Sequence, residues 1–207
     1  FLIVLAVAAE AYLLGSVDTG ILVSKYLYHD DVRTHGSGAA GMTNMLRTFG
    51  KKAAALTAVG DVLKGVVAVC LGRWLFGHLP ADAAVSPYLG VYLAAILAVV
   101  GHSKPIYFGF KGGKGVSSTC GVMLMTFWWQ ALICYVITIA LIAITKFVSL
   151  GSLALVVLFG ILVTATNWGN WLVIAWVWVI AGLCIYRHHA NIGRLIHGTE
   201  RKIGQKA

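Results

Sequence analysis

Residues 101–115 read GHSKPIYFGFKGGKG, a short polar stretch that holds three lysines and five glycines. Strongly apolar sequence flanks it on both sides, at residues 88–103 and 116–129. Glycines let several backbone N–H groups converge on an anion, and lysine ammonium groups add full positive charge. A helix that begins near Val116 would direct the positive end of its dipole toward the same place. The stretch therefore predicts a phosphate-binding turn at the edge of a bilayer.

The composition is that of a membrane protein. Of the 207 residues, 59% are hydrophobic and 11% are charged, whereas soluble domains carry roughly a quarter charged residues. The net charge is +9, and the basic residues lie between the apolar stretches. This placement indicates that they determine membrane topology and bind anionic ligands or lipids, and it does not indicate nucleic-acid binding. All four cysteines lie in apolar runs without metal-ligand spacing, so we expect packing roles, no metal and no cofactor. No repeat or long linker appears, so we expect one membrane-embedded domain over residues 1–207.

Seven apolar stretches approach the ~17–25 residues that a helix needs to cross a bilayer. They are residues 1–28, 53–77, 88–103, 116–129, 131–144, 150–165 and 171–186. The pattern predicts an all-α polytopic integral membrane protein with about seven transmembrane helices. The fourth and fifth stretches meet near residues 128–130 and are compatible with two full spans or with a helical hairpin.

The positions of the basic residues predict how the spans are oriented in the membrane. In a seven-span arrangement the basic residues of the loops fall on one side, and only Arg73 lies near the opposite side. The positive-inside rule makes the basic side cytoplasmic, so the N-terminus is outside and the C-terminus is cytoplasmic. Three large polar segments then share this side: residues 29–52, 103–115 and 187–207. We expect them to converge on one site.

The first of these segments contains HGSGAAGMTNMLRTFG at residues 35–50. Its glycines predict a flexible turn around Ser37, and Thr43, Asn44 and Arg47 begin a predicted helix. Arginine can hold a phosphate through two parallel hydrogen bonds, and hydroxyl and amide groups add directional donors. An ordinary helix cap with an interfacial arginine is an equally good interpretation.

Asp61 and Lys64 lie three residues apart inside the second apolar stretch. An ion pair between positions i and i+3 of a helix is the least costly way to hold both charges there. A structural pair is the favoured interpretation, although Lys64 could also reach toward a ligand.

The third polar segment reads RHHANIGRLIHGTERKIG at residues 187–204. His188, Asn191 and Arg194 follow one another at intervals of three, so one helical face can present them together. Histidine can move a proton near neutral pH, and asparagine can orient a hydroxyl group. A basic tail that contacts acidic lipid is the alternative.

Six stretches together resemble one known family, the bacterial acyl-phosphate:glycerol-3-phosphate acyltransferases, which are integral membrane enzymes of phospholipid synthesis. The stretches are GSVDTG (15–20), HGSGAAGMTNMLRTFGKKAA (35–54), DVLKG (61–65), GHSKPIYFGFKGGKGV (101–116), SLGS (149–152) and RHHANIGRLIHGTERKI (187–203). The resemblance implies seven spans and an active site on the cytoplasmic face of the bacterial inner membrane. It also implies transfer of an acyl group from acyl phosphate to the 1-hydroxyl of glycerol 3-phosphate, which gives lysophosphatidic acid and inorganic phosphate.

The resemblance implies catalytic roles for Ser37, His188 and Asn191. The expected substrate- and phosphate-binding residues are Gly38, Thr43, Asn44, Arg47, Lys64, His102, Lys104, Lys111, Gly112, Gly113, Lys114, Gly115 and Arg194. The chain departs from the family pattern at Asp18, where proline is usual, at Ala39, where asparagine is usual, and at Met42, where alanine is usual. A membrane transporter for a phosphorylated small metabolite is the alternative function, and it would need polar groups deeper in the later spans.

Overall fold

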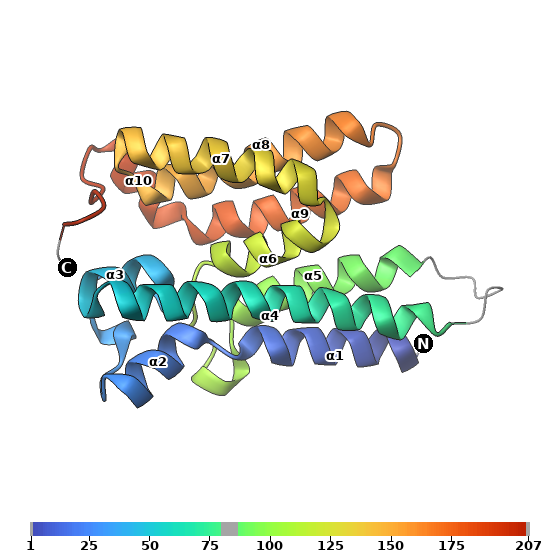
Figure 1. The fold of residues 1–207 in the computed structure, drawn as a ribbon, viewed down its shortest axis with the longest axis horizontal. Coiled ribbons are helices and arrows are strands. Elements are labelled where there is room, and N and C mark those ends of the chain that lie inside the picture. The colour runs from blue at the N-terminus through green and yellow to red at the C-terminus, as the bar shows by residue number, and fades with distance from the viewer. Residues whose placement is uncertain (1, 80–86, 206–207) are drawn as a thin grey trace. The chain divides into compact units, whose positions relative to one another are not determined.

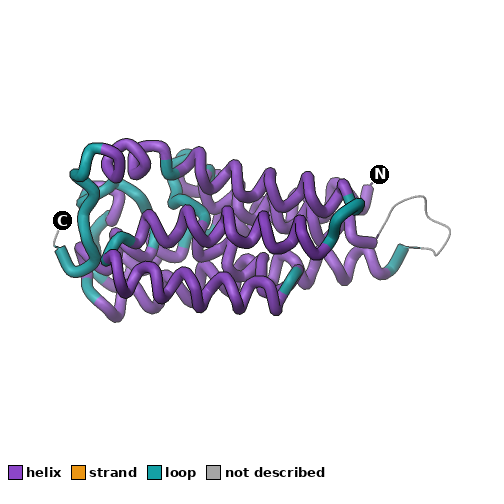
Figure 2. The backbone as a smooth tube through the Cα atoms, turned by 90° about the horizontal axis from the view of Figure 1, so that it is seen from above, coloured by secondary structure: helices purple, strands orange, loops and turns teal. Residues whose placement is uncertain are grey.

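In a computed structural model, residues 2–79 and 87–205 are described, and all of them form helices or loops, without a strand (Figure 2). The chain forms two compact units, Phe1–Thr126 and Phe127–Ala207. The all-α prediction is therefore confirmed for the described part of the chain. The prediction of one domain over residues 1–207 stays a prediction.

The first unit contains six α-helices and two short 3-10 helices within its described residues. They are α1 (Leu2–Ser16), α2 (Thr19–Leu27), η1 (Val32–Thr34), α3 (Met42–Phe49), α4 (Lys51–Gly77), α5 (Pro87–Ser103), η2 (Ile106–Phe108) and α6 (Val116–Thr126). Helix α3 begins where the polar segment at residues 35–50 predicts a helix. Helix α6 begins at Val116, as the dipole argument requires.

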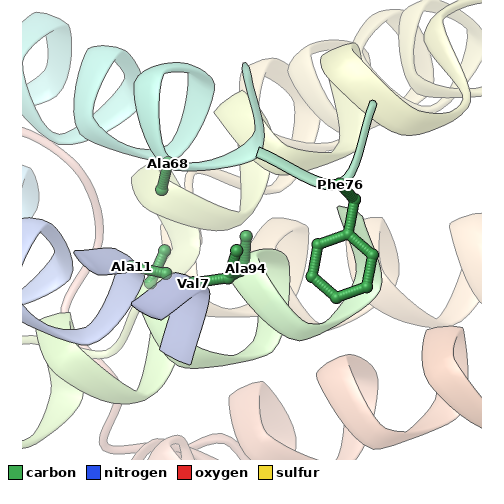
Figure 3. Close-up of a cluster of buried hydrophobic side chains, with 6 residues drawn as sticks. Val7, Ala11, Ala68, Phe76 and Ala94 are labelled. Carbon is green, nitrogen blue, oxygen red and sulfur yellow. The ribbon is translucent and has the colours of Figure 1, made fainter. Parts of the chain in front are cut away.

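Helices α1, α4 and α5 pack side by side and build the core of the first unit (Figure 1). Figure 3 shows the centre of this core, where Val7 and Ala11 of α1 meet Ala68 and Phe76 of α4 and Ala94 of α5. A side chain at Gly15 would collide with the backbone of Ala98, so α1 and α5 approach at backbone distance. Small residues at such crossings are typical of membrane helices, which gain stability from close packing.

Helices α1 and α2 meet at a break formed by Val17 and Asp18. Asp18 has extended backbone angles, and its carboxylate accepts a hydrogen bond from the Ile21 N–H group at 3.3 Å. This is the contact of an N-cap residue, which satisfies one of the unpaired N–H groups at a helix start. The break interrupts the helical hydrogen bonding of an otherwise apolar span, next to α4 and α5.

The second unit contains α7 (Trp128–Thr145), α8 (Val148–Thr166), α9 (Trp171–Arg187) and α10 (His189–Ile196). Helix α8 packs against α7 and α9, and buried Cys184 contributes to the apolar contact between α8 and α9. Helix α10 is bent by 63° relative to α9. The bend lies at His188, the first residue of the predicted polar tail face.

Five helical segments of the described chain are long and apolar enough to cross a membrane, or six if the bent pair α9–α10 counts as one. The fourth predicted stretch differs most from its prediction, since α6 has only 11 residues and stops at Thr126. The Arg73 guanidinium donates to the Met125 carbonyl at 2.8 Å, and the Thr126 hydroxyl donates to the Val122 carbonyl at 2.8 Å. The contact from Arg73 satisfies a carbonyl group of the last turn, which would otherwise lack an intrahelical partner.

Candidate active site

Asn44 organises the loop that carries Ser37. Its amide nitrogen donates to the carbonyls of Val32, His35 and Ala39, each at 3.0 Å, and its carbonyl accepts from the Ser37 N–H group at 3.1 Å. Its side chain is buried in this contact set. The loop therefore has one defined shape, with the Ser37 side chain exposed at its surface.

The other predicted residues of this segment lie close to that loop. Gly38 has a positive φ of 68°, which a glycine adopts without strain. Thr43 and Arg47 lie on α3 and are both half-buried. The structure thus brings Ser37, Gly38 and Asn44 together and sets Thr43 and Arg47 on the adjoining helix.

The glycine-lysine turn begins at the end of α5 and leads into α6. The Gly113 N–H group donates to the His102 carbonyl at 3.2 Å, and side chains at Gly112 or Gly113 would collide with His102 and Pro105. Glycine is therefore required at both positions by the close approach of the chain. Lys111 is exposed and Lys114 half-exposed, so both ammonium groups lie at the surface of the turn.

The first loop and the turn are joined directly by Arg33. Its guanidinium donates to the carbonyl of Phe108 at 2.9 Å and lies 3.5 Å from the carbonyl of Lys111. Two of the three predicted polar segments therefore adjoin within the first unit. Lys104 lies at the same end of α5 with an exposed side chain, and its carbonyl accepts from the Tyr12 hydroxyl at 2.8 Å.

Lys64 and His102 lie in a buried polar cluster beneath the turn. The Lys64 ammonium contacts Asp61 Oδ1 at 2.8 Å, His102 Nδ1 at 2.8 Å and the Val17 carbonyl at 2.9 Å. The predicted ion pair between positions i and i+3 is confirmed. Lys64 thus meets three protein acceptors, and its contact with His102 links it to the turn.

Asp18 completes this cluster. Its Oδ2 atom lies 3.9 Å from His102 Nδ1 and accepts no hydrogen bond from the described residues. Ligand atoms of Asp18, Asp61 and His102 all lie within 4.8 Å of one another, which is close enough to hold a metal ion. The Lys64 ammonium already lies against two of them, so the chain supplies a cation to this cluster itself.

The tail of the second unit gathers its polar side chains around Glu200. Asn191 Nδ2 donates to Glu200 Oε1 at 2.8 Å, Arg194 Nε donates to Oε2 at 2.6 Å, and the Ser149 hydroxyl donates to Oε1 at 2.9 Å. The Glu200 side chain is only 4% exposed. Burial raises the pKa of Glu200, but the hydrogen bonds from Asn191, Arg194 and Ser149 outweigh it and hold the pKa below its usual value.

The sequence argument missed Glu200, although it noted Ser149 as part of a family stretch. Glu200 follows Arg194 by six residues, which is no helical interval, and it reaches its partners only because α10 ends at Ile196. The sequence does contain a feature that could have identified Glu200, because it is the only acidic residue in the basic tail at residues 187–207.

His188 lies at the junction of α9 and α10 and is buried. Its Nδ1 atom lies 2.7 Å from the Cys184 carbonyl. A carbonyl can only accept a hydrogen bond, so Nδ1 carries the proton and the neutral ring has its lone pair on Nε2. This tautomer suits a proton acceptor.

Comparison with known proteins decides the family. The family model described as glycerol-3-phosphate acyltransferase matches residues 4–198. This chain belongs to the glycerol-3-phosphate acyltransferase family. The resemblance identified from the six stretches is thereby confirmed at the level of the family.

Members of this acyltransferase family match nearly the whole chain. A glycerol-3-phosphate acyltransferase of Clostridioides difficile is 44% identical over 200 residues, covering 97% of this chain and 95% of its own. One of Neisseria meningitidis serogroup B is 42% identical over 202 residues, covering 95% of each chain.

Two solved structures are similar to this acyltransferase in fold. Both are crystal structures of PlsY, an integral membrane glycerol 3-phosphate acyltransferase, in a glycerol 3-phosphate form and a lysophosphatidic acid form. The first has a TM-score of 0.86 and 33% identity, covering 97% of this chain and 96% of its own. The second has a TM-score of 0.83 and 31% identity, covering 97% and 95%.

Proposed function

We propose that this integral membrane acyltransferase takes its acyl group from acyl phosphate and transfers it to the 1-hydroxyl of glycerol 3-phosphate. The products are lysophosphatidic acid and inorganic phosphate. The observation that carries the proposal is the contact of Arg33 with Phe108 and Lys111, which joins the loop of Ser37 to the glycine-lysine turn. Two cationic, glycine-rich segments that adjoin can hold two phosphorylated substrates side by side.

Each segment is assigned to one substrate. Ser37, Thr43, Asn44, Arg47 and Lys104 lie around glycerol 3-phosphate, with Asn44 acting through the loop shape that it maintains. Residues 111–115 hold the phosphate of the acyl donor, together with the N-terminus of α6. Lys64 and His102 support this turn from beneath, since the His102 carbonyl accepts from Gly113.

The reaction needs few protein groups. The 1-hydroxyl oxygen attacks the acyl carbon, a tetrahedral oxyanion forms, and the carbon–oxygen bond to phosphate then breaks. Phosphate is a good leaving group, so correct placement of two anions and stabilisation of the oxyanion supply much of the rate. The hydroxyl proton passes to Nε2 of His188 or to a substrate phosphate oxygen. Asn191 orients the hydroxyl, and Glu200 holds Asn191 and Arg194 in place.

The finer topology belongs to the same proposal. The protein has seven spans, with its N-terminus outside and its C-terminus in the cytoplasm. This topology puts the loop of Ser37, the glycine-lysine turn and the tail on the cytoplasmic side of the bacterial inner membrane. Soluble glycerol 3-phosphate then arrives from the cytoplasm, and the acyl chains stay in the lipid.

Purified protein in detergent micelles tests the function. We expect phosphate release and lysophosphatidic acid in equal amounts from acyl phosphate and glycerol 3-phosphate, and no product when acyl phosphate is replaced by acyl-coenzyme A. Product formed equally well from acyl-coenzyme A would overturn the donor assignment. Labelling of single cysteines introduced at Ser37 and at His197 in sealed inverted vesicles tests the topology, since both should be accessible only from the cytoplasmic side.

A further inference from the structure

Arg33 has a distinctive position between the loop of Ser37 and the glycine-lysine turn. It lies in η1, and its Nη1 atom donates to the Phe108 carbonyl at 2.9 Å and reaches the Lys111 carbonyl at 3.5 Å. Phe108 ends η2, and Gly109 and Phe110 both follow with positive φ angles of 64° and 59°. Arg33 thus contacts the turn on both sides of its tightest bend.

Asp31 fixes the guanidinium in this position. Its carboxylate accepts from Arg33 Nε at 2.9 and 3.2 Å, from Nη2 at 2.7 Å and from the Arg33 backbone N–H group at 3.0 Å. The side chains are 25% and 21% exposed. The Arg33 guanidinium beside Asp31 lowers the pKa of that carboxyl group to about 2. One edge of the guanidinium is therefore occupied by Asp31, and the other is directed at the turn.

The contact determines which way the peptide groups of the turn point. In a trans peptide the carbonyl and the following N–H group point in opposite directions, and the described residues contain no cis peptide bond. Because the Lys111 carbonyl faces Arg33, the Gly112 N–H group is directed away from it. The same holds for the Phe108 carbonyl and the Gly109 N–H group. Holding two carbonyls on one side thus turns two N–H groups to the other.

We propose that Arg33 is a positioning residue which, held by Asp31, fixes the glycine-lysine turn against the loop of Ser37 and thereby sets the affinity for acyl phosphate. The inference rests on the proposed function, because it takes this turn as the site of the donor phosphate. Arg33 acts through the turn, since Nε and Nη2 donate to Asp31 and Nη1 donates to the carbonyls of the turn.

Two variants and one matched control test the role of Arg33. Arg33→Lys keeps the positive charge but cannot contact Asp31 and both carbonyls at once, because an ammonium lacks the planar fork. Asp31→Asn keeps Arg33 but weakens the hydrogen bonds and the ion pair that hold its guanidinium. Lys25→Met is the control, since Lys25 contacts the same Asp31 carboxylate at 3.8 Å with a side chain that is 45% exposed, and it lies on α2, outside the turn and the loop of Ser37.

The first readout is amide hydrogen exchange of residues 110–113, which does not depend on turnover. The N–H groups of Phe110 and Gly113 donate to Pro105 and His102, so they exchange slowly while the turn keeps its shape. We expect exchange to be faster by about tenfold in Arg33→Lys, by a smaller factor in Asp31→Asn, and unchanged in Lys25→Met. Equal exchange in Arg33→Lys and the parent protein would overturn the proposal.

The second readout is the KM for each substrate in the detergent assay. In Arg33→Lys we expect the KM for acyl phosphate to rise by about tenfold, while the KM for glycerol 3-phosphate stays within about twofold and the melting temperature is unchanged. A change in the KM for glycerol 3-phosphate alone, or an equal effect of Lys25→Met, refutes the positioning role. If the parent protein gives no product from acyl phosphate, the donor assignment fails, and hydrogen exchange alone decides whether Arg33 holds the turn.

Discussion

The Lys64 ammonium lies 2.8 Å from Nδ1 of His102, although 38 residues separate the two along the chain. An ammonium group can only donate a hydrogen bond, so the imidazole accepts at Nδ1 and carries its proton on Nε2. A side chain at Gly113 would collide with this Nε2 atom. A buried lysine of α4 thus sets the tautomer of a histidine that faces the glycine-lysine turn.

Replacing Lys64 by methionine should destabilise the protein strongly. The variant leaves the buried Asp61 carboxylate without its cation, and breaking a buried ion pair in this way costs about 3–5 kcal/mol. Thermal unfolding in detergent measures the loss. The double variant Lys64→Met with Asp61→Asn should recover part of it, because both charges are then absent. A double variant as unstable as the single one would contradict this account.

Asp18→Asn should leave stability unchanged or raise it slightly. Asparagine keeps the N-cap contact with the Ile21 N–H group, and it removes one carboxylate from a cluster in which two carboxylates face the single Lys64 ammonium. Asp18→Ala is the comparison, and loss of the cap should cost ~1 kcal/mol. Melting temperatures decide the order of the two variants. An asparagine variant clearly less stable than the parent protein would show that the Asp18 charge is required.

Glu200→Gln should lower kcat by about tenfold or more, while the variant keeps the parent fold. The neutral amide keeps the size of the side chain but replaces a carboxylate that accepts from Asn191, Arg194 and Ser149, and hydrogen bonds to charged groups contribute ~1.5–3 kcal/mol. Steady-state kinetics in detergent measure the effect. Thr199→Ala is the neighbouring control, because the Thr199 hydroxyl is exposed and makes only a 3.4 Å contact with the Arg194 carbonyl. Equal rates in both variants would exclude a role for Glu200 in turnover.

His188→Gln separates two proton acceptors. The glutamine amide can still donate to the Cys184 carbonyl, but it cannot accept a proton. If His188 is the general base, kcat falls by ~10²–10⁴-fold with little change in either KM. If a substrate phosphate takes the proton, the loss is below about tenfold. We expect the larger effect, because the tautomer of His188 places its lone pair on Nε2.

Alanine at Arg47, Lys104 or Lys114 should reduce turnover if these residues hold phosphate. Each variant removes one cation, and a charge-assisted hydrogen bond to phosphate is stronger than a neutral one, so kcat/KM should fall by about tenfold or more. Lys52→Ala is the control, since Lys52 is an exposed cation in the first turn of α4. Full activity in all three variants would mean that the phosphates are bound elsewhere.

Local sequence patterns predicted the helices well. Apolar run lengths located the long helices, the start of α6 at Val116 followed from the glycines before it, and the spacing of Asp61 and Lys64 predicted their ion pair. These features depend on residues a few positions apart. The contact of Arg73 with the last turn of α6 did not follow from the sequence, because 52 residues separate Arg73 from Met125.

Contacts between distant segments were the part that the sequence could not predict. Three such contacts join residues that have no periodic relation in the sequence. They are the hydrogen bonds of Asn44 within its loop, the contact of Lys64 with His102 and the hydrogen bonds of the tail to Glu200. The family resemblance implied that Asn44 and Lys64 bind substrate or phosphate, whereas the spacing of Asp61 and Lys64 favoured a structural ion pair. The structure shows both side chains with several protein partners, so the binding role that we propose for them acts through the protein groups that they hold.

The single amide of Asn44 has a consequence for the energetics of substrate capture. Together with backbone hydrogen bonds such as the one from the Gly38 N–H group to the His35 carbonyl, it holds the loop of Ser37, so the entropy of ordering these residues is lost once, when the chain folds, and not again when a ligand binds. At the glycerol 3-phosphate site that we propose here, affinity then depends mainly on how well the charge and hydroxyl groups of the ligand match a loop whose shape is set before binding.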